Sequence, residues 1–376
     1  MIGLRWRARG MAAVLACAML PAHADILVGQ VAPLSGVLAT TGQQMMLGGR
    51  VVFDAVNAEG GINGEKIKVL TADDGYEVDK TLRLTRDMVA NPKVVALFGF
   101  AGTANIAALL REKVLENAGI ALVAPYTGGE PLRSPYNPWI FHVRAGYSDE
   151  TENMVAQLVA QGESRIAVIY QNDAFGQSGL AGVRSALERR HMQLASAASY
   201  ERNTTEVRAA VKATLAAQPQ AVILIAVNKP AAAFIAAYRA EGGGGQLLSI
   251  SVVDPAELVR LGGIAAVHGL GITQVVPFPY QPQTAAVREF QSAMARYAPG
   301  HEINYTNFEE FLGAKVLVEG LRRAGPHPDR ARLIAALESL NPYDLGGLRV
   351  SFGPHNRLGS RFVDLTVIGE TGRLLK

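Results

Sequence analysis

The sequence has almost no cysteine, and this absence excludes several kinds of site. Cys17 is the only thiol among 376 residues, so no disulfide bond can form within the chain. If the N-terminal segment that contains Cys17 is removed, a cysteine nucleophile and a cysteine-bound metal are excluded as well. A chain of this length and 49% hydrophobic composition can bury a large core without disulfide bonds, and its length predicts about two domains.

Common catalytic signatures are also missing. The sequence contains no G-x-x-x-x-G-K-[ST], no G-x-S-x-G and no H-E-x-x-H motif. No G-x-G-x-x-G follows the first predicted strand, which argues against a dinucleotide-binding enzyme. Six histidines follow residue 24, but they are scattered without metal-ligand spacing. Two of the adjacent acidic pairs, Asp73-Asp74 and Glu309-Glu310, could suggest an acid/base site. Neighbouring residues on a strand point to opposite faces, so Asp73 and Asp74 make a poor acid/base pair, and we interpret the pairs as capping or loop residues.

The only apolar run that suggests a membrane-directed segment lies at the N-terminus. Three arginines precede the apolar stretch 11–20, which is too short to cross a bilayer. Ala22-His23-Ala24 then forms a small-x-small cleavage site. We therefore expect residues 1–24 to be a signal peptide that is cleaved after Ala24. Lipidation at Cys17 is the disfavoured alternative, because the residues before it match a lipoprotein cleavage site poorly.

The mature chain has little excess charge of either sign. Removal of three arginines leaves 36 − 3 = 33 basic side chains against 33 acidic ones. Proteins that bind nucleic acid or an anionic membrane surface usually carry a clear positive excess. We therefore expect no nucleic-acid or membrane-surface partner.

What the sequence does contain begins with a strand–loop–helix pattern at 25–64. The segment 26–32 is short, apolar and partly β-branched, as is typical of a buried strand. From Gly42 the apolar residues recur with helical spacing until Gly60-Gly61 ends the helix. The loop 33–36 follows the strand, at the edge where open α/β sheets bind ligands.

The same alternation continues along the chain. It predicts parallel sheets covered by helices on both faces, and the irregular stretch 125–138 indicates a division into two doubly wound lobes. The further predicted strands are 66–72, 94–98, 120–124, 139–143, 165–170, 194–200, 221–227 and 247–251. The further predicted helices are 79–90, 104–117, 148–161, 180–190, 206–217 and 229–241. Three helices, 284–297, 306–323 and 329–339, and two strands, 348–352 and 362–368, complete the chain.

Loops at the predicted strand ends carry small hydroxyls, glycines and aromatic rings. In a two-lobed protein these loops face one cleft, where hydroxyls and backbone N–H groups hold a carboxylate and rings cover an apolar part. Each residue alone is ordinary in a loop, and the signal lies in their joint placement. The candidate ligand-binding residues are Ser35, Ala101, Gly102, Thr103, Tyr126, Thr127, Gly128, Phe175, Asn228 and Ser251.

The segment VGQVAPLSGVLATTGQQMMLGGRVVFDAVNAEGGING resembles the start of periplasmic solute-binding proteins of the leucine/isoleucine/valine-binding family. The similarity continues through GFAGTAN, APYTGGEPLR, FHVRAGYSDE and IAVIYQNDAFGQSGL and covers nearly all of the chain after residue 24. It implies the type I periplasmic-binding fold, an α/β fold in which two Rossmann-like lobes, joined by three crossover segments, close on a ligand. The implied lobe 1 is 25–143 plus 275–345, and lobe 2 is 144–274 plus 346–376. The crossovers are expected near 143–146, 271–276 and 343–347.

The resemblance implies the periplasmic component of an ABC-type importer rather than an enzyme. Such a protein closes on a small carboxylate-bearing ligand, such as an amino acid, and delivers it to a membrane permease. It needs no cofactor or metal, and we expect it to be a monomer. By motif, 101–103 and 126–128 would hold the carboxylate or amine, and Phe175 would pack on the ligand. A sensor module that presents the ligand to a receptor stays open as an alternative, while an exported α/β enzyme is disfavoured.

Two departures from the family pattern bear on the ligand. Amino-acid binders of this family often place an acidic residue on lobe 2 to pair with the ammonium, but 249–253 contains no carboxylate before Asp254. Gly128 also stands where a hydroxyl residue is common. Because a buried ammonium without an anion is costly, an aromatic or aliphatic acid or an amide becomes a serious candidate beside an amino acid. We expect specificity to depend on Tyr126, Thr127, Phe175 and Ser251.

Overall fold

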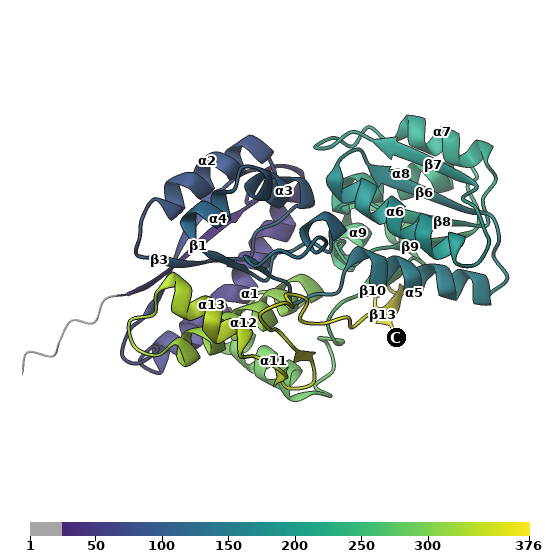
Figure 1. Ribbon diagram of the computed structural model, residues 1–376. Helices are drawn as coiled ribbons and strands as arrows, with labels where there is room; N and C mark the ends of the chain where they lie inside the picture. The colour runs from purple at the N-terminus through teal and green to yellow at the C-terminus, as the bar shows by residue number, and fades with distance from the viewer. Residues whose placement is uncertain (1–24) are drawn as a thin grey trace, which may run out of the picture.

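The computed structural model describes residues 25–376, which form two α/β lobes side by side (Figure 1). The predicted signal peptide lies outside the described residues. Lobe 1 is built on a five-stranded parallel sheet with the order β2-β1-β3-β4-β5. Its strands are β1 (Ile26–Ala32), β2 (Ile67–Asp73), β3 (Val94–Phe98), β4 (Ala121–Val123) and β5 (Ile140–Phe141).

Helices cover both faces of this sheet. One face packs on α1 and on three helices that come from late in the sequence, through a core that includes Phe53, Phe98 and Phe311. The other face packs on α2, α3 and α4, through residues such as Leu97 and Ile106. These helices are α1 (Ala39–Ala58), α2 (Val78–Val89), α3 (Thr103–Arg111), α4 (Val114–Ala118), α11 (Ala285–Tyr297), α12 (Tyr305–Ala324) and α13 (Arg330–Glu338). Two short 3-10 turns, η1 (Gly36–Leu38) and η2 (Glu130–Leu132), lie in the loops.

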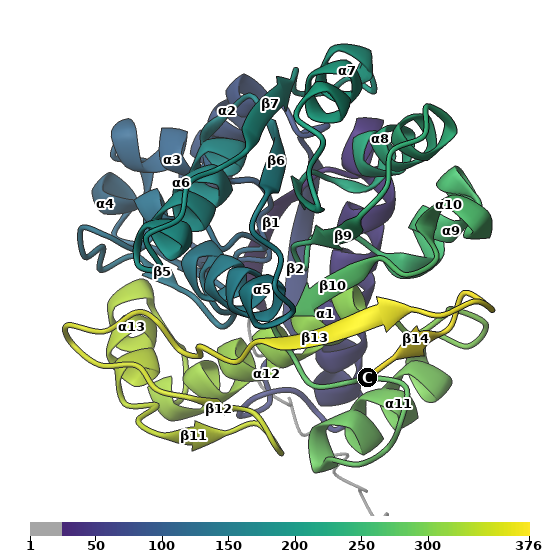
Figure 2. The ribbon, with the colours of Figure 1, turned by 90° about the vertical axis from the view of Figure 1, so that its right-hand side faces the viewer.

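Lobe 2 has a seven-stranded sheet with the order β14-β13-β10-β9-β8-β6-β7. The last two strands of the chain run antiparallel along one edge, as Figure 2 shows in yellow. The strands are β6 (Ile166–Gln171), β7 (Ser196–Tyr200), β8 (Ala221–Ile225), β9 (Gln246–Ser249), β10 (Gly271–Gln274), β13 (Asp364–Ile368) and β14 (Leu374–Leu375). The helices are α5 (Tyr147–Ala160), α6 (Ala174–Glu188), α7 (Arg208–Ala216), α8 (Asn228–Ala240), α9 (Pro255–Gly262) and α10 (Ile264–Val267). Among residues 25–376, no helix has both the length and the apolarity needed to cross a membrane.

Three connections join the lobes. The first runs from β5 to α5 and the second from β10 to α11. The third lies later than the predicted 343–347, because β11 (Tyr343–Asp344) and β12 (Arg349–Val350) form a hairpin on lobe 1. Phe352 still packs edge-to-face on Phe141, with ring centroids 5.3 Å apart, so the crossing falls between Phe352 and β13. Gly346 and Gly347 form the turn of this hairpin, and their N–H groups donate to the Asp344 carboxylate.

Two predicted helices differ from the observed ones. The predicted helix 104–117 is split into α3 and α4, because Lys113 adopts a left-handed φ of 52°. Helix α6 begins six residues before the predicted 180–190. Asp173 caps it by accepting hydrogen bonds from the N–H groups of Phe175 and Gly176. A Cβ on Gly176 would lie 1.8 Å from the Gln171 carbonyl oxygen, so this glycine serves close packing rather than a turn.

Candidate ligand-binding site

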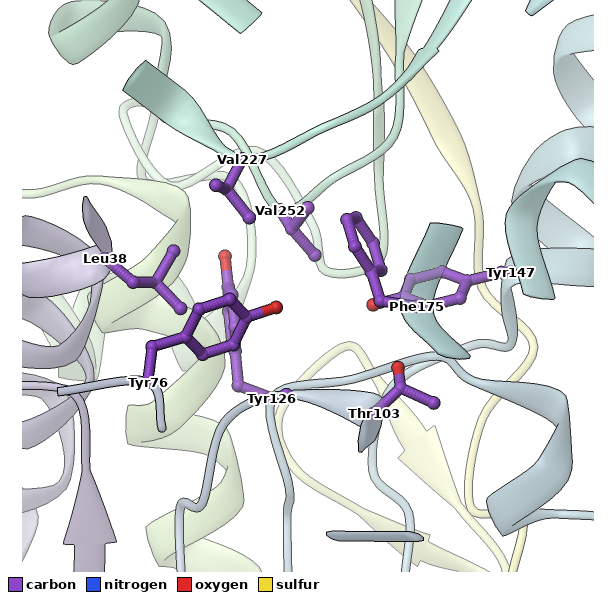
Figure 3. Close-up of a pocket in the computed structure, with 9 residues that line it drawn as sticks. Leu38, Tyr76, Thr103, Tyr126, Tyr147, Phe175, Val227 and Val252 are labelled. Atoms are coloured by element: carbon purple, nitrogen blue, oxygen red, sulfur yellow. The ribbon is translucent and has the colours of Figure 1, made fainter. Parts of the chain in front are cut away.

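A cavity lies between the lobes and is walled by side chains from both (Figure 3). Its volume is about 20 Å³, which leaves room for about one water molecule, so the walls have nearly met. An organic ligand can therefore occupy this cavity only if the walls move apart. The lining residues are Leu38, Tyr76, Gly102, Thr103 and Tyr126 from lobe 1 and Tyr147, Phe175, Val227 and Val252 from lobe 2.

Direct hydrogen bonds between the lobes show that the cleft is closed. The Tyr126 hydroxyl donates to the Ser251 carbonyl oxygen at 3.4 Å. The Lys229 ammonium donates to the Gly36 carbonyl oxygen at 3.1 Å. These bonds need the two lobes in contact, so they are lost whenever the hinge opens.

The polar wall of the cavity is the N-terminus of α3. Gly102 precedes the helix with a φ of 95°, and a Cβ there would lie 2.7 Å from the Tyr76 ring. The first N–H groups of a helix have no partner within it and carry partial positive charge, which suits an anion. Beside them the Thr103 hydroxyl is 2.7 Å from the hydroxyl of Thr127. This wall therefore offers backbone donors and a hydroxyl to a carboxylate.

The remaining walls are apolar and aromatic. Phe175 packs edge-to-face on Tyr147 with ring centroids 5.5 Å apart, and Figure 3 shows Tyr76 and Tyr126 on the opposite side. Burial raises the pKa of the hydroxyls of Tyr76, Tyr126 and Tyr147, so all three rings stay neutral. None of the nine lining residues is acidic or basic. The cavity thus has a place for one anionic or polar group and an apolar remainder.

Four of the predicted ligand-binding residues line the cavity, and three others support it. Thr127 hydrogen-bonds Thr103 and accepts from the Gly129 N–H at 3.1 Å. Ala101 forms a β-bridge with Tyr126 and fixes its backbone. A Cβ on Gly128 would lie 2.6 Å from the Tyr147 ring, so a hydroxyl residue would displace this wall residue. The four lining residues are Gly102, Thr103, Tyr126 and Phe175.

The structure places Ser35, Asn228 and Ser251 off the cavity wall. Exposed Ser35 uses its N–H to bind the Asp73 carboxylate, while the buried Asn228 side chain accepts from the Asp254 N–H at 2.7 Å. Ser251 donates through its backbone N–H to Glu150 at 2.8 Å. Each of these polar groups has its partners elsewhere, and a nearby apolar residue lines the cavity instead. Those apolar residues are Leu38, Val227 and Val252.

Two aromatic wall residues were not predicted. Tyr76 follows β2 after Gly75, and Tyr147 opens α5 within the FHVRAGYSDE segment that carries the resemblance. Their position after a strand and at a helix start is the same signal that identified Tyr126. The interpretation of Asp73-Asp74 as loop and capping residues holds only for the loop role. Asp73 ends β2 and accepts from N–H groups of the neighbouring loops, while Asp74 accepts from the Tyr76 N–H and from the Thr81 hydroxyl. Neither residue caps α2, whose N-cap is Glu77.

Behind the aromatic wall lies a buried charged cluster around Arg144, on the first connection between the lobes. Its guanidinium is 3.3 Å from the carboxylates of both Glu150 on lobe 2 and Glu309 on lobe 1. It also stacks 5.0 Å from the centroid of the Tyr126 ring. The interpretation of Glu309-Glu310 as a capping or loop pair is therefore wrong, because both residues are buried within α12, in its second turn. Arg144 joins the two lobes directly behind the ligand cavity.

Two carboxylates share this one guanidinium, and burial raises the pKa of Glu309 to about 7 although Arg144 opposes the shift. Glu150 raises that pKa further and Arg133 lowers it. The folded protein thus holds a proton on Glu309 that the unfolded chain releases near pH 4.5. The stabilisation that this proton gives to the folded state is complete below pH 4.5 and is lost as the pH rises to about 7.

We expect the free energy of unfolding to fall by up to about 3 kcal/mol more in the natural protein than in Glu309→Gln between pH 4.5 and 8. Urea unfolding at a series of pH values measures the difference. Glu188→Gln, an exposed change at the end of α6, is the control and should follow the natural protein. Parallel pH profiles of the natural protein and Glu309→Gln would contradict this assignment.

Two α/β lobes with a small, mostly apolar cavity between them define a protein that holds a small molecule between its lobes. The profile of the family described as "Periplasmic binding protein" matches residues 25–372, and the chain belongs to this family. Its members are binding proteins rather than enzymes, so the chain is a solute-binding protein of the ABC-transporter type. The doubly wound, two-lobed fold predicted from the sequence is thereby confirmed.

The chain is similar to several known proteins over nearly its full length. A substrate-binding periplasmic protein from Ralstonia solanacearum is 41% identical, with a TM-score of 0.89 over 93% of this chain and 99% of that one. A possible leucine/isoleucine/valine-binding protein from Rhodopirellula baltica is 28% identical, with a TM-score of 0.89 over 94% of this chain and 97% of that one. Leu/Ile/Val-binding protein homolog 7 of Brucella abortus is 25% identical over 328 residues, which cover 83% of this chain and 80% of that protein.

Proposed function

We propose that this protein binds a small apolar monocarboxylate, either branched aliphatic or aromatic, between its lobes and delivers it to the membrane permease of an ABC importer. The signal peptide 1–24 would direct it to the periplasm and be removed after Ala24. One observation carries the proposal: the N-terminus of α3 and Thr103 face a cavity whose other walls are apolar and aromatic, with no charged side chain.

The arrangement of donors favours a carboxylate end. Helical N–H groups at Gly102 and Thr103 stabilise negative charge, and the Thr103 hydroxyl adds a donor. An amide could use the same donors through its carbonyl oxygen, at lower affinity because charge-assisted hydrogen bonds are stronger. The valines and the rings of Tyr147 and Phe175 suit a branched or aromatic body.

A branched-chain amino acid is the second candidate, supported by the names of the Brucella and Rhodopirellula relatives. Its ammonium would lie in this cavity without a carboxylate partner. Burial of an unpaired ammonium costs several kcal/mol, of which tyrosine hydroxyls and carbonyl oxygens recover only a part. The chemistry of the walls therefore favours the acid over the amino acid of the same carbon skeleton.

Titration calorimetry on protein unfolded and refolded to remove any retained ligand tests this proposal. We expect isovalerate or benzoate to bind at least about tenfold more tightly than leucine, and the amide isovaleramide to bind more weakly than isovalerate. Mass spectrometry of the molecule retained by protein from its natural host would identify the ligand directly. Saturable binding of leucine with no binding of either acid would reject the acid in favour of the amino acid.

The Thr103→Val variant tests the placement of the carboxylate. The change removes one hydroxyl donor while it keeps the side-chain shape, so we expect about tenfold weaker binding of the acid. Thr205→Val, at an exposed position between β7 and α7, is the matched control and should bind as the natural protein does. Equal affinities of Thr103→Val and the control would place the carboxylate elsewhere.

A further inference from the structure

Arg202 lies on the loop after β7 of lobe 2 and reaches across the cleft to lobe 1. Its Nη2 donates to the Tyr76 carbonyl oxygen and to Oδ1 of Asn105, both at 2.6 Å. Its guanidinium carbon lies 3.7 Å from the centroid of the Tyr76 ring, in a cation–π contact. The other end of the guanidinium binds Asp173 of its own lobe at 2.7 Å. A single side chain therefore makes three contacts with the opposite lobe.

Tyr76, the residue that Arg202 contacts, lines the ligand cavity and has a strained backbone. Tyr76 adopts a φ of 65°, a left-handed backbone that costs free energy for any residue with a Cβ. Its hydroxyl also accepts a hydrogen bond from the Gln171 amide of lobe 2 at 3.2 Å. The carbonyl, ring face and hydroxyl of Tyr76 are thus all held by the opposite lobe. Such strain persists where surrounding contacts over-determine the conformation, as they do here in the closed state.

The other partners of Arg202 belong to the same cavity. Asn105 lies in the first turn of α3, whose N-terminus forms the polar wall. Asp173 caps α6 by accepting from the Phe175 N–H at 3.0 Å, and Phe175 is a wall residue of lobe 2. Arg202 therefore joins three wall elements: the Tyr76 loop, the start of α3 and the start of α6.

Burial distinguishes this contact from an ordinary surface ion pair. The side chains of Arg202 and Asp173 are only 16% and 10% exposed, so solvent screens their interaction weakly. The planar guanidinium presents several donors in a fixed fork while its face stacks on the ring, which a lysine ammonium cannot reproduce. All the contacts to Tyr76 and Asn105 are lost when the lobes part.

We propose that Arg202 is the latch of the closed state, a positioning residue that holds Tyr76 over the cavity and sets how long the lobes stay shut. The inference rests on the proposed function only for the place of the ligand, since closure itself is measurable without any ligand. By this assignment, Arg202 acts on the ratio of closed to open molecules and on the rate of ligand release. It does not contact the ligand.

Single-molecule fluorescence transfer between two dyes tests the latch. Residues 25–376 contain no cysteine, so Asp87→Cys on α2 and Lys212→Cys on α7 give one exposed labelling site on each lobe. We expect Arg202→Ala to lower the closed-to-open ratio at least about tenfold and Arg202→Lys to lower it less. Arg208→Ala, an exposed arginine at the start of α7, is the matched control and should leave the ratio unchanged.

A second measurement covers the case in which the ligand-free protein is closed too rarely for fluorescence. Thr40→Cys with Glu257→Cys places two thiols where the natural side chains meet across the cleft at 3.3 Å. A short bifunctional thiosulfonate reagent then joins them at a rate that follows the closed fraction. In this background too, Arg202→Ala should react at least about tenfold more slowly than Arg208→Ala.

Thermal unfolding separates the latch from a merely structural role. Each lobe keeps its own core in Arg202→Ala, so we expect its melting temperature to match that of Arg208→Ala. An unchanged closed-to-open ratio, or an unchanged cross-linking rate where closure is rare, would overturn the proposal. Failure of isovalerate and benzoate to bind would count against the proposed ligand class. It would not affect the test of Arg202, because the closed-to-open ratio is measured without ligand.

Discussion

At pH 8, where Glu309 has lost its proton, replacement of Arg144 by methionine is expected to lower the free energy of unfolding by about 3–5 kcal/mol, since it leaves two buried carboxylates without their cation. Arg144 is only 1% exposed, and Glu150 and Glu309 are its partners on opposite lobes. Methionine keeps most of the side-chain volume, so a cavity contributes little to the loss. The cost arises from carboxylates that must be buried unpaired or take up protons.

A combined variant distinguishes this cause from poor packing. Arg144→Met with Glu150→Gln and Glu309→Gln removes the unpaired charges, and we expect it to regain most of the lost stability. Arg189→Met is the control, because its pair with Glu152 is half exposed and contributes little. Urea unfolding gives the free energy of unfolding of these three variants and of the natural protein. If the triple variant is as unstable as Arg144→Met, the loss comes from packing against Tyr126 and Tyr147 instead.

The regular parts of the fold could be predicted because their signals are local. Strands β1 and β3 have the predicted bounds, and most other elements begin or end within three residues of prediction. Their apolar runs and helical spacing depend only on neighbours in the chain. The start of α6 was missed for the opposite reason. Gly176 and Gly179 look like loop residues in sequence, yet they are required by the close packing of α6 on the sheet, which is a tertiary contact.

The site could be predicted at the level of loops but not of every residue. Strand-end loops did supply the cavity walls, because the carboxyl ends of parallel strands share one edge of a sheet. Which side chain of a loop faces the cavity depends on the opposite lobe. Ser251 turns to the charged cluster while its neighbour Val252 lines the cavity, and Arg202 gains its role only through Tyr76. A search for polar residues in the sequence favours Ser251 and passes over Val252.

Replacement of Val252 by aspartate is expected to reverse the preference of the cavity between isovalerate and leucine. Val252 lines the cavity from lobe 2, and none of the wall residues of the cavity is charged. The resemblance to amino-acid binders places their ammonium-binding carboxylate in the same stretch. A carboxylate there pairs with the leucine ammonium, and a charged hydrogen bond of this kind contributes about 1.5–3 kcal/mol, or roughly 10-fold to 150-fold in affinity.

The same aspartate should weaken isovalerate by about tenfold or more, because two carboxylates of like charge then share one small cavity of low polarity. Val252→Asn is the matched control, since it is similar in size but cannot supply the negative charge. Titration calorimetry of isovalerate and leucine against the natural protein and both variants gives the ratio of the two affinities for each of the three proteins. If Val252→Asp leaves the ratio of leucine to isovalerate affinity unchanged, Val252 does not face the α-carbon of the ligand. The natural cavity would then exclude amino acids by shape rather than by the lack of an anion.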